Sequence, residues 1–224
     1  LQQLFCISLM NECSTQCPSY LKRLPHLFNG PILTTNFDRV IEYLFKEEGL
    51  PCPDMVIPSD NFQNDKIKSA LHRNSSILIK MHGDIEDPQH LILTQTSYNE
   101  VYGDNQKYPD LGKPMPAFLQ KVLERNPLLF LGCSLSTDRT CSVIRMCAPS
   151  SQQFAILSLP KETANLDNPL QPHLREENNQ FKAAWKERRK YILQELNIQA
   201  FWYPHGMHKE ALEAFFTRLF EDLG

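Results

Sequence analysis

Five short runs of apolar residues, rich in Ile, Leu and Phe, recur along the chain. Runs of this length and composition predict buried strands. The predicted strands span residues 31–35, 76–81, 127–132, 154–159 and 198–203. Because each run is apolar throughout and does not alternate with polar residues, both faces of these strands are expected to be covered.

Amphipathic helical patterns separate most of the predicted strands. After the first strand the pattern comprises Val40, Ile41, Leu44 and Phe45, and Gly49 follows where a C-terminal cap is expected. Two further apolar stripes flank the last strand and are expected to face the core. They comprise Phe181, Trp185, Ile192 and Leu196 before it, and Leu212, Phe215, Phe216, Leu219, Phe220 and Leu223 after it. Strands that alternate with helices predict an α/β class with a mostly parallel sheet covered on both faces.

Stretches rich in polar residues or Pro predict three surface connections, over residues 59–74, 104–116 and 164–179. With 224 residues, the chain suits one large domain, and we predict a single domain over residues 1–224. The first residues read as a helix where an opening strand is expected, so we predict that a segment upstream is missing.

Composition narrows the class of function. No apolar run approaches the roughly 20 residues that span a bilayer, which argues against a membrane role. A net charge of -3 gives no reason to expect nucleic acid as a partner, and the basic run over residues 186–190 lies in a helical pattern typical of a solvated face. Seven cysteines without framework spacing, and no signal peptide, favour reduced thiols in the cytoplasm.

Polar residues gather where predicted strands end. In open parallel sheets, ligands bind beyond the carboxyl ends of the strands, where loops lead into helices. Four strands end in such segments: TTNFD at residues 34–38, HGD at 82–84, GCSLSTD at 132–138 and PHGMH at 204–208. The sequence therefore predicts a ligand site at one rim of the sheet.

The segments TTNFD, MHGD and GCSLSTD resemble, in the same order, three segments of sirtuins. The intervening segment LILTQTSY resembles the sequences of one branch of the sirtuin-like family, the NAD hydrolases of bacterial antiphage defence. The resemblance covers roughly residues 20 to 220 and implies a Rossmann-like domain that binds NAD as a substrate. It also implies that the bond between nicotinamide and ribose is cleaved, as by an NAD nucleosidase.

The resemblance implies roles for particular residues. Asn36 and His82 are the expected catalytic pair, because an amide can hold the ribose or the attacking water and an imidazole can accept a proton near neutral pH. The expected NAD-binding residues are Thr35, Asn36, Asp38, Gly132, Ser134 and Ser158. Asp38 is also expected to cap the following helix, Gly132 to admit the ligand to the backbone, and Ser158 to reach the adenosine ribose.

Structural interpretations compete with these roles. Taken alone, an Asn-Phe-Asp segment before a helix is typical of capping, and a lone His82 is typical of a turn; their joint occurrence with GCSLSTD favours function. His205 and His208 after the last strand fit turn and cap chemistry better than a ligand site. The carboxylates of DIEDP, residues 84–88, fit a polar turn better than an acid/base pair.

Two departures from sirtuins shape the functional prediction. The chain has no CxxC, and hence no zinc module, which argues against an acyl-lysine substrate and leads us to expect no metal. No glycine-rich turn on an opening strand precedes residue 31, so the N-terminal strand and its pyrophosphate-binding loop are expected to lie outside this sequence. We predict an NAD hydrolase; the alternatives are an NAD-dependent protein deacylase and a non-catalytic NAD or ADP-ribose sensor or scaffold.

The resemblance also implies a setting in the cell. It suggests an effector that depletes NAD during antiphage defence, in a homo-oligomer or in a complex with an ATPase, an Argonaute-like protein or a sensor. The residues themselves do not choose among these partners.

Overall fold

Six strands form two three-stranded sheets, and every pairing in the described part of the chain is parallel. The computed structural model describes residues 19–27, 30–58, 64–73, 75–104, 108–133, 135, 139–147, 151–160 and 175–223. The chain divides into a first unit, Leu1–Asp104, Asp110–Ala117 and Leu212–Gly224, and a second unit, Asn105–Pro109 and Phe118–Ala211. One domain over residues 1–224 stays a prediction.

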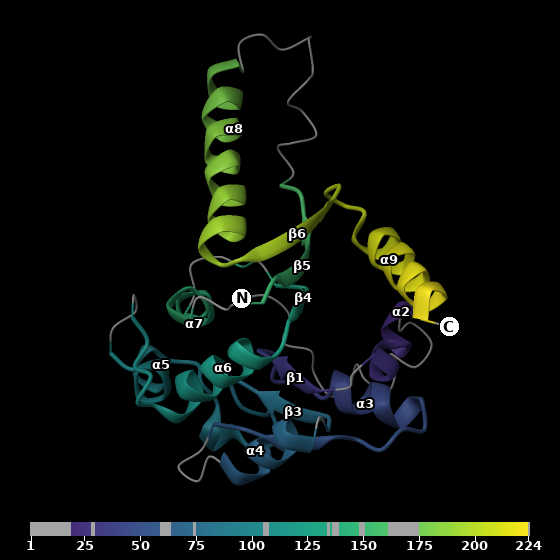
Figure 1. Ribbon diagram of the computed structural model, residues 1–224, viewed down its shortest axis with the longest axis vertical. Helices are drawn as coiled ribbons and strands as arrows, with labels where there is room; N and C mark the ends of the chain where they lie inside the picture. The colour runs from purple at the N-terminus through teal and green to yellow at the C-terminus, as the bar shows by residue number, and fades with distance from the viewer. Residues whose placement is uncertain are drawn as a thin grey trace. The chain divides into compact units, whose positions relative to one another are not determined.

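The first sheet has the order β1-β3-β2, from β1 (Pro31–Thr34), β2 (Asp54–Val56) and β3 (Ile77–Lys80). All four residues of β3 are buried, because this strand has a neighbour on each edge and helices beside it. Figure 1 shows α3 (Val40–Glu47) and α4 (Asn64–Arg73) beside this sheet. Phe45 of α3 packs with Ile32 and Leu78, so the stripe predicted for this helix is confirmed.

Short helices complete the first unit. Before β1 lie α2 (Ser19–Lys22) and the 3-10 helix η1 (Leu24–Leu27), and after β3 lie the 3-10 helix η2 (Pro88–His90) and α5 (Gln95–Tyr102). The C-terminal α9 (His208–Leu223) starts in the second unit and continues in the first from Leu212. It buries Leu212 and Phe216 of its predicted stripe, and Arg23 lies over the ring of Phe220 at 5.4 Å. The expected cap Gly49 has a φ of +66°, a left-handed conformation that favours glycine.

The second sheet has the order β4-β5-β6, from β4 (Leu129–Leu131), β5 (Gln153–Ser158) and β6 (Ile198–Tyr203). Its helices are α6 (Pro114–Arg125), which starts in the first unit, α7 (Arg139–Cys147) and α8 (Arg175–Lys190), which passes into the π-helix η5 (Tyr191–Glu195) before β6. Trp185 of α8 meets Trp202 of β6 edge to face at 4.5 Å, and Ile192 and Leu196 are buried. The stripe predicted before the last strand therefore faces the sheet.

The prediction of a surface connection over residues 59–74 is wrong, because α4 occupies Asn64–Arg73. The helix is mostly polar, but Ile67 and Ala70, three positions apart, are both buried. One side of the helix therefore faces the protein interior. The connections predicted at 104–116 and 164–179 end earlier than expected, since α6 begins at Pro114 and α8 at Arg175. Proline is well suited to the first position of a helix.

The predicted fold class is confirmed: parallel sheets flanked by helices form a Rossmann-like α/β structure. The five predicted strands are present with small shifts at their ends, and β2 is an additional strand. Prolines at positions 51, 53 and 58 surround it and predict a loop, but Pro is tolerated beside an edge strand such as this one. The helix predicted at the start of the chain lies outside the described residues.

Candidate functional site

The loops after β1 and β3 lie side by side at the carboxyl edge of the first sheet. The two strands pair in parallel, and backbone hydrogen bonds continue between the loops that follow. The N–H of Met81 donates to the carbonyl of Thr34 at 2.8 Å, and the N–H of Ile85 donates to the carbonyl of Phe37 at 2.9 Å. These two adjacent loops carry the two predicted catalytic residues.

The loop after β1 presents Thr35 and Asn36 to solvent. The backbone N–H of Asn36 donates to Oγ1 of Thr34 at 3.1 Å, which closes a tight turn at the end of the strand. Oδ1 of Asp38 accepts from the N–H of Val40, the first residue of α3, at 3.1 Å. The N-cap of α3 is Arg39, whose side chain makes no capping hydrogen bond, so Asp38 does not occupy the expected cap position and instead binds the first helical N–H from the residue before the cap. The Asn36 side chain remains at the surface.

His82 is half-buried between two aromatic residues. Its Nε2 lies 3.0 Å from the hydroxyl of Tyr98, and Nδ1 lies 3.5 Å from the same hydroxyl. The Tyr98 ring meets the imidazole edge-on at 5.2 Å, and the Phe37 ring lies 6.2 Å away. Because Phe37 follows Asn36 directly, this contact brings the His82 ring against the loop that carries the amide.

The chain between His82 and Tyr98 folds back on itself. The N–H of Ile92 donates to the carbonyl of His82 at 2.9 Å. Gly83 has a φ of +96°, and a Cβ at this position would lie 2.5 Å from the carbonyl oxygen of His90. The glycine of MHGD is therefore required by the turn itself, whatever the ligand.

The second sheet carries the remaining predicted binding residues at its own carboxyl edge. Gly132 follows β4 with a φ of +64°, and a Cβ there would have no neighbour within 4 Å. Ser158, the last residue of β5, is exposed, and its hydroxyl donates to the carbonyl of Leu159 at 3.0 Å. Ser134 and residues 136–138 lie outside the described residues.

Ser158 belongs to a small polar cluster that sequence reasoning did not foresee. It lies in register with Tyr203, whose hydroxyl contacts Nδ1 of His208 at the start of α9. Burial raises the pKa of Tyr203 above its ordinary value, although a hydrogen bond with Ser158 opposes this rise. His208 is thus tied to the strand end, while His205 is exposed in the turn before it.

A family model described as SIR2-like domain matches residues 31–201. The chain belongs to the SIR2-like domain family. The match begins at the first residue of β1 and ends within β6, so it spans both sheets and all the predicted site residues. No curated protein matches the chain. Membership confirms the sirtuin-like resemblance and indicates an NAD-related function.

Beneath the paired loops, the SIR2-like domain holds a network of buried charges. Lys80, at the end of β3, is 0% exposed, and its Nζ lies 2.7 Å from Asp84 and 2.9 Å from Glu42 of α3. The same ammonium donates to the carbonyl oxygen of Asp38. Arg39 adds ion pairs with Glu42 at 2.9 Å and with Asp84 at 3.3 Å. The network therefore ties the loop after β1 to the loop after β3.

Within this network, the carboxyl group of Asp84 is held in its charged form. Burial alone raises the pKa of a carboxyl group, but here the hydrogen bond from Lys80, the backbone N–H of Glu86 at 2.8 Å and the charges of Lys80 and Arg39 outweigh it. The pKa of Asp84 consequently lies below its ordinary value. A sequence signal was present, since Lys80 ends an otherwise apolar buried strand, but its partners were not apparent.

The DIEDP segment forms the polar turn that its composition predicts. The N–H of Asp87 donates to the carbonyl of Asp84 at 2.9 Å, and the Asp87 carboxylate meets Nδ1 of His90 at 2.8 Å. Asp84 has its partners inside the network, and Glu86 binds Arg39 at 2.7 Å on the outside. Each of these carboxylates thus has a partner within or beside the loop.

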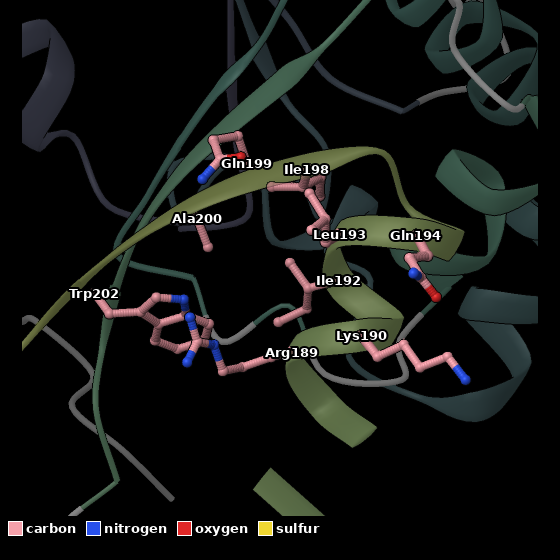
Figure 2. Close-up of a pocket in the computed structure, with 9 residues that line it drawn as sticks. All are labelled: Arg189, Lys190, Ile192, Leu193, Gln194, Ile198, Gln199, Ala200 and Trp202. Carbon is pink, nitrogen blue, oxygen red and sulfur yellow. The ribbon is translucent and has the colours of Figure 1, made fainter. Parts of the chain in front are cut away.

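A separate cavity lies in the second unit, between η5 and β6. Figure 2 shows Ile192, Ile198 and Trp202 along its wall, with Arg189 beside them. None of the predicted site residues lines it. Over the described residues, no group of three or more His, Cys, Asp or Glu side chains is arranged to hold a metal ion. None of the helices in that part of the chain is both long and apolar enough to cross a bilayer.

Proposed function

We propose that this SIR2-like domain is an NAD nucleosidase, which hydrolyses the bond between nicotinamide and ribose and releases nicotinamide and ADP-ribose. One observation carries the proposal. The backbone bonds between the loops after β1 and β3 hold an exposed amide, Asn36, next to the loop of a half-buried imidazole, His82. Family membership supports NAD as the substrate on which these groups act.

The chemistry requires little acid catalysis, because the nicotinamide of NAD is already a cationic leaving group. When its bond to C1′ of the ribose breaks, the electron pair moves to the ring nitrogen and nicotinamide departs neutral. Positive charge develops on the ribose, as in glycoside hydrolysis. The Asn36 amide, with both a donor and an acceptor, holds a ribose hydroxyl or the attacking water.

His82 acts as the general base. As the water oxygen bonds to C1′, one water proton passes to the imidazole, whose reference pKa near 6.5 suits proton transfer at neutral pH. The imidazolium then releases that proton to solvent. The products are nicotinamide, ADP-ribose and one proton, so charge and atoms balance.

The other predicted residues bind the substrate in this proposal. Thr35 and Asp38 bind NAD beside Asn36, and Asp38 also holds this loop in shape through its contact with α3. On the second sheet, Gly132 admits the backbone to the ligand, Ser134 binds ribose or phosphate oxygen, and Ser158 reaches the adenosine ribose.

The test is to incubate the full-length protein, with any partner, with NAD and to measure nicotinamide and ADP-ribose by chromatography. We expect Asn36→Ala and His82→Ala each to lower kcat by at least about 100-fold, in the range of lost general-base catalysis. His72→Ala, an exposed histidine on α4, serves as the control and is expected to retain full turnover. Unchanged turnover in either site variant would remove that residue from the mechanism.

We further propose that the domain works in the cytoplasm as an NAD-depleting effector of bacterial antiphage defence. The similarity of its motifs to the NAD hydrolases of such systems supports this role. In this setting the domain assembles into a homo-oligomer or with an ATPase, an Argonaute-like protein or a sensor. Measuring cellular NAD after phage infection, in cells with the wild-type protein and with His82→Ala, tests the role: equal NAD levels would contradict it.

A further inference from the structure

We propose that Lys80 is a positioning residue for the reaction, whose ammonium group fixes the loop of Asn36 against the loop of His82. This inference deepens the proposed function and rests on it. Lys80 ends β3, two residues before His82, and its side chain is fully buried. Its Nζ donates to the main-chain carbonyl of Asp38, in the loop after β1. The lysine therefore links the strand that leads into the imidazole with the loop that carries the amide.

The loop after β1 is held on both sides of Asn36. Backbone N–H groups of the loop after β3 donate to the carbonyls of Thr34 and Phe37, which precede and follow Asn36. Lys80 adds a third bond at the next carbonyl, that of Asp38. Asn36 itself is exposed, and its N–H closes a tight turn on Thr34. The amide therefore projects from a short turn whose two ends are attached to the neighbouring segment.

Three oxygen atoms from three different segments lie around the buried ammonium. A carboxylate oxygen of Glu42 on α3 lies 2.9 Å from Nζ, and one of Asp84 in the loop after β3 lies 2.7 Å from it. The third is the carbonyl oxygen of Asp38, so the number matches the three N–H groups of an ammonium. The two carboxylates already compensate the charge of the buried lysine. The bond to the carbonyl is not needed for that compensation, and we assign to it the placement of the loop.

The placement matters because the proposed reaction needs two groups from two loops. Asn36 holds a ribose hydroxyl or the attacking water while His82 takes a proton, so the distance between the two side chains must stay fixed. A displacement of about 1 Å can lower the rate about 100-fold. Without the lysine, the loop keeps its two backbone bonds but loses the one at Asp38, and Asn36 moves more freely. Lys80 thus acts on kcat through Asn36 and touches no reacting atom itself.

A variant with a neutral network separates this role from stability. Lys80→Met alone leaves two buried carboxylates without their lysine, so it is combined with Glu42→Gln and Asp84→Asn, which remove both charges with little change in size. In this triple variant we expect kcat for NAD hydrolysis, per folded molecule by circular dichroism, to fall at least about tenfold, with KM within about threefold.

Glu42→Gln alone is the matched control, because it alters the network but keeps the lysine and its bond to Asp38. Its kcat should stay within about threefold of the wild-type value. A folded triple variant with the kcat of Glu42→Gln would overturn the inference, since the lysine would then contribute to stability alone.

A second measurement is independent of turnover. Nitrogen relaxation of the Asn36 backbone amide, recorded without NAD, reports how firmly the loop is held. We expect an order parameter near the rigid value of about 0.85 in the wild type and in Glu42→Gln, and a clearly lower value in the triple variant. A mobile amide in the wild type, or an equally rigid one in the triple variant, would overturn the inference even if NAD were hydrolysed. Absence of NAD hydrolysis by the wild type would instead overturn the proposed function and leave the relaxation result to decide whether Lys80 holds the loop.

Discussion

The carboxyl ends of the two sheets differ in how their residues are held by the rest of the protein. At the first sheet, a fully buried lysine and a carboxylate that is 1% exposed lie under the loops, which are further joined by backbone hydrogen bonds. At the second sheet, Gly132 has open space around it and Ser158 is exposed. Buried ion pairs therefore hold the loops at the end of the first sheet, whereas the end of the second sheet exposes the Gly132 backbone and the Ser158 hydroxyl to solvent.

The difference matches what each end does in the proposed reaction. A general base and an amide must be held within a fraction of an ångström of the reacting atoms, and such precision comes from the residues that pack behind them. Groups that bind sugar or phosphate tolerate looser support, because backbone N–H groups and hydroxyls adapt to the ligand. We therefore expect substitutions beneath the first end to be far more damaging than comparable ones at the second.

The largest effect is expected from Lys80→Met, which keeps the length of the side chain but removes the ammonium. Asp84 and Glu42 would then lie in the interior with only the partly exposed Arg39 as a shared cation. Breaking a buried ion pair in this way costs about 3–5 kcal/mol. The free energy of unfolding, measured by circular dichroism in denaturant, should fall by that amount.

Arg218→Met provides the control in the same unit. Arg218 is 74% exposed and pairs with Glu221 and Asp222 on the surface of α9. Exposed pairs contribute about 0–1 kcal/mol, so this variant should unfold almost as the wild type does. If Lys80→Met cost no more than Arg218→Met, the buried network would not be the support of the first end.

A smaller effect is expected from Gly83→Ala, with Gly132→Ala as its counterpart at the second sheet. Both glycines have positive φ, but a Cβ at Gly83 meets the His90 carbonyl, whereas at Gly132 it meets nothing. We expect Gly83→Ala to cost about 2–3 kcal/mol of unfolding free energy and to lower NAD turnover, because the turn that holds His82 must move. Gly132→Ala should cost only the backbone penalty, about 1 kcal/mol. Equal losses in the two variants would contradict the contrast between the ends.

The sequence predicted this contrast only in part. Apolar runs located the strands, and polar residues at their ends located Asn36 and His82, because both signals are local. The short strand β2 was not predicted, since prolines surround it and its partner β3 lies some twenty residues away along the chain. Helix α4 was hidden by its polar composition.

The support beneath the site was beyond sequence reasoning for the same reason. Lys80 and Glu42 are brought together by the packing of α3 near β3, and no periodicity or motif encodes that pairing. Likewise, the LILTQTSY segment carried a family resemblance, but only the folded chain shows Tyr98 against His82. Positions at strand ends can be predicted from patterns, while their partners depend on tertiary structure.

The smallest effect is expected from the titration of Asp84. Because its pKa is lower in the folded protein than in the unfolded chain, where Asp titrates near 3.9, the charged form stabilises the fold at neutral pH. That contribution is fully present above the unfolded pKa and is lost as the pH falls through the folded pKa. Measured from pH 7 to pH 2, the stability of the wild type should therefore fall faster below about pH 4 than that of Asp84→Asn. Parallel curves for wild type and Asp84→Asn would show that Lys80 and Arg39 do not hold Asp84 in its charged form.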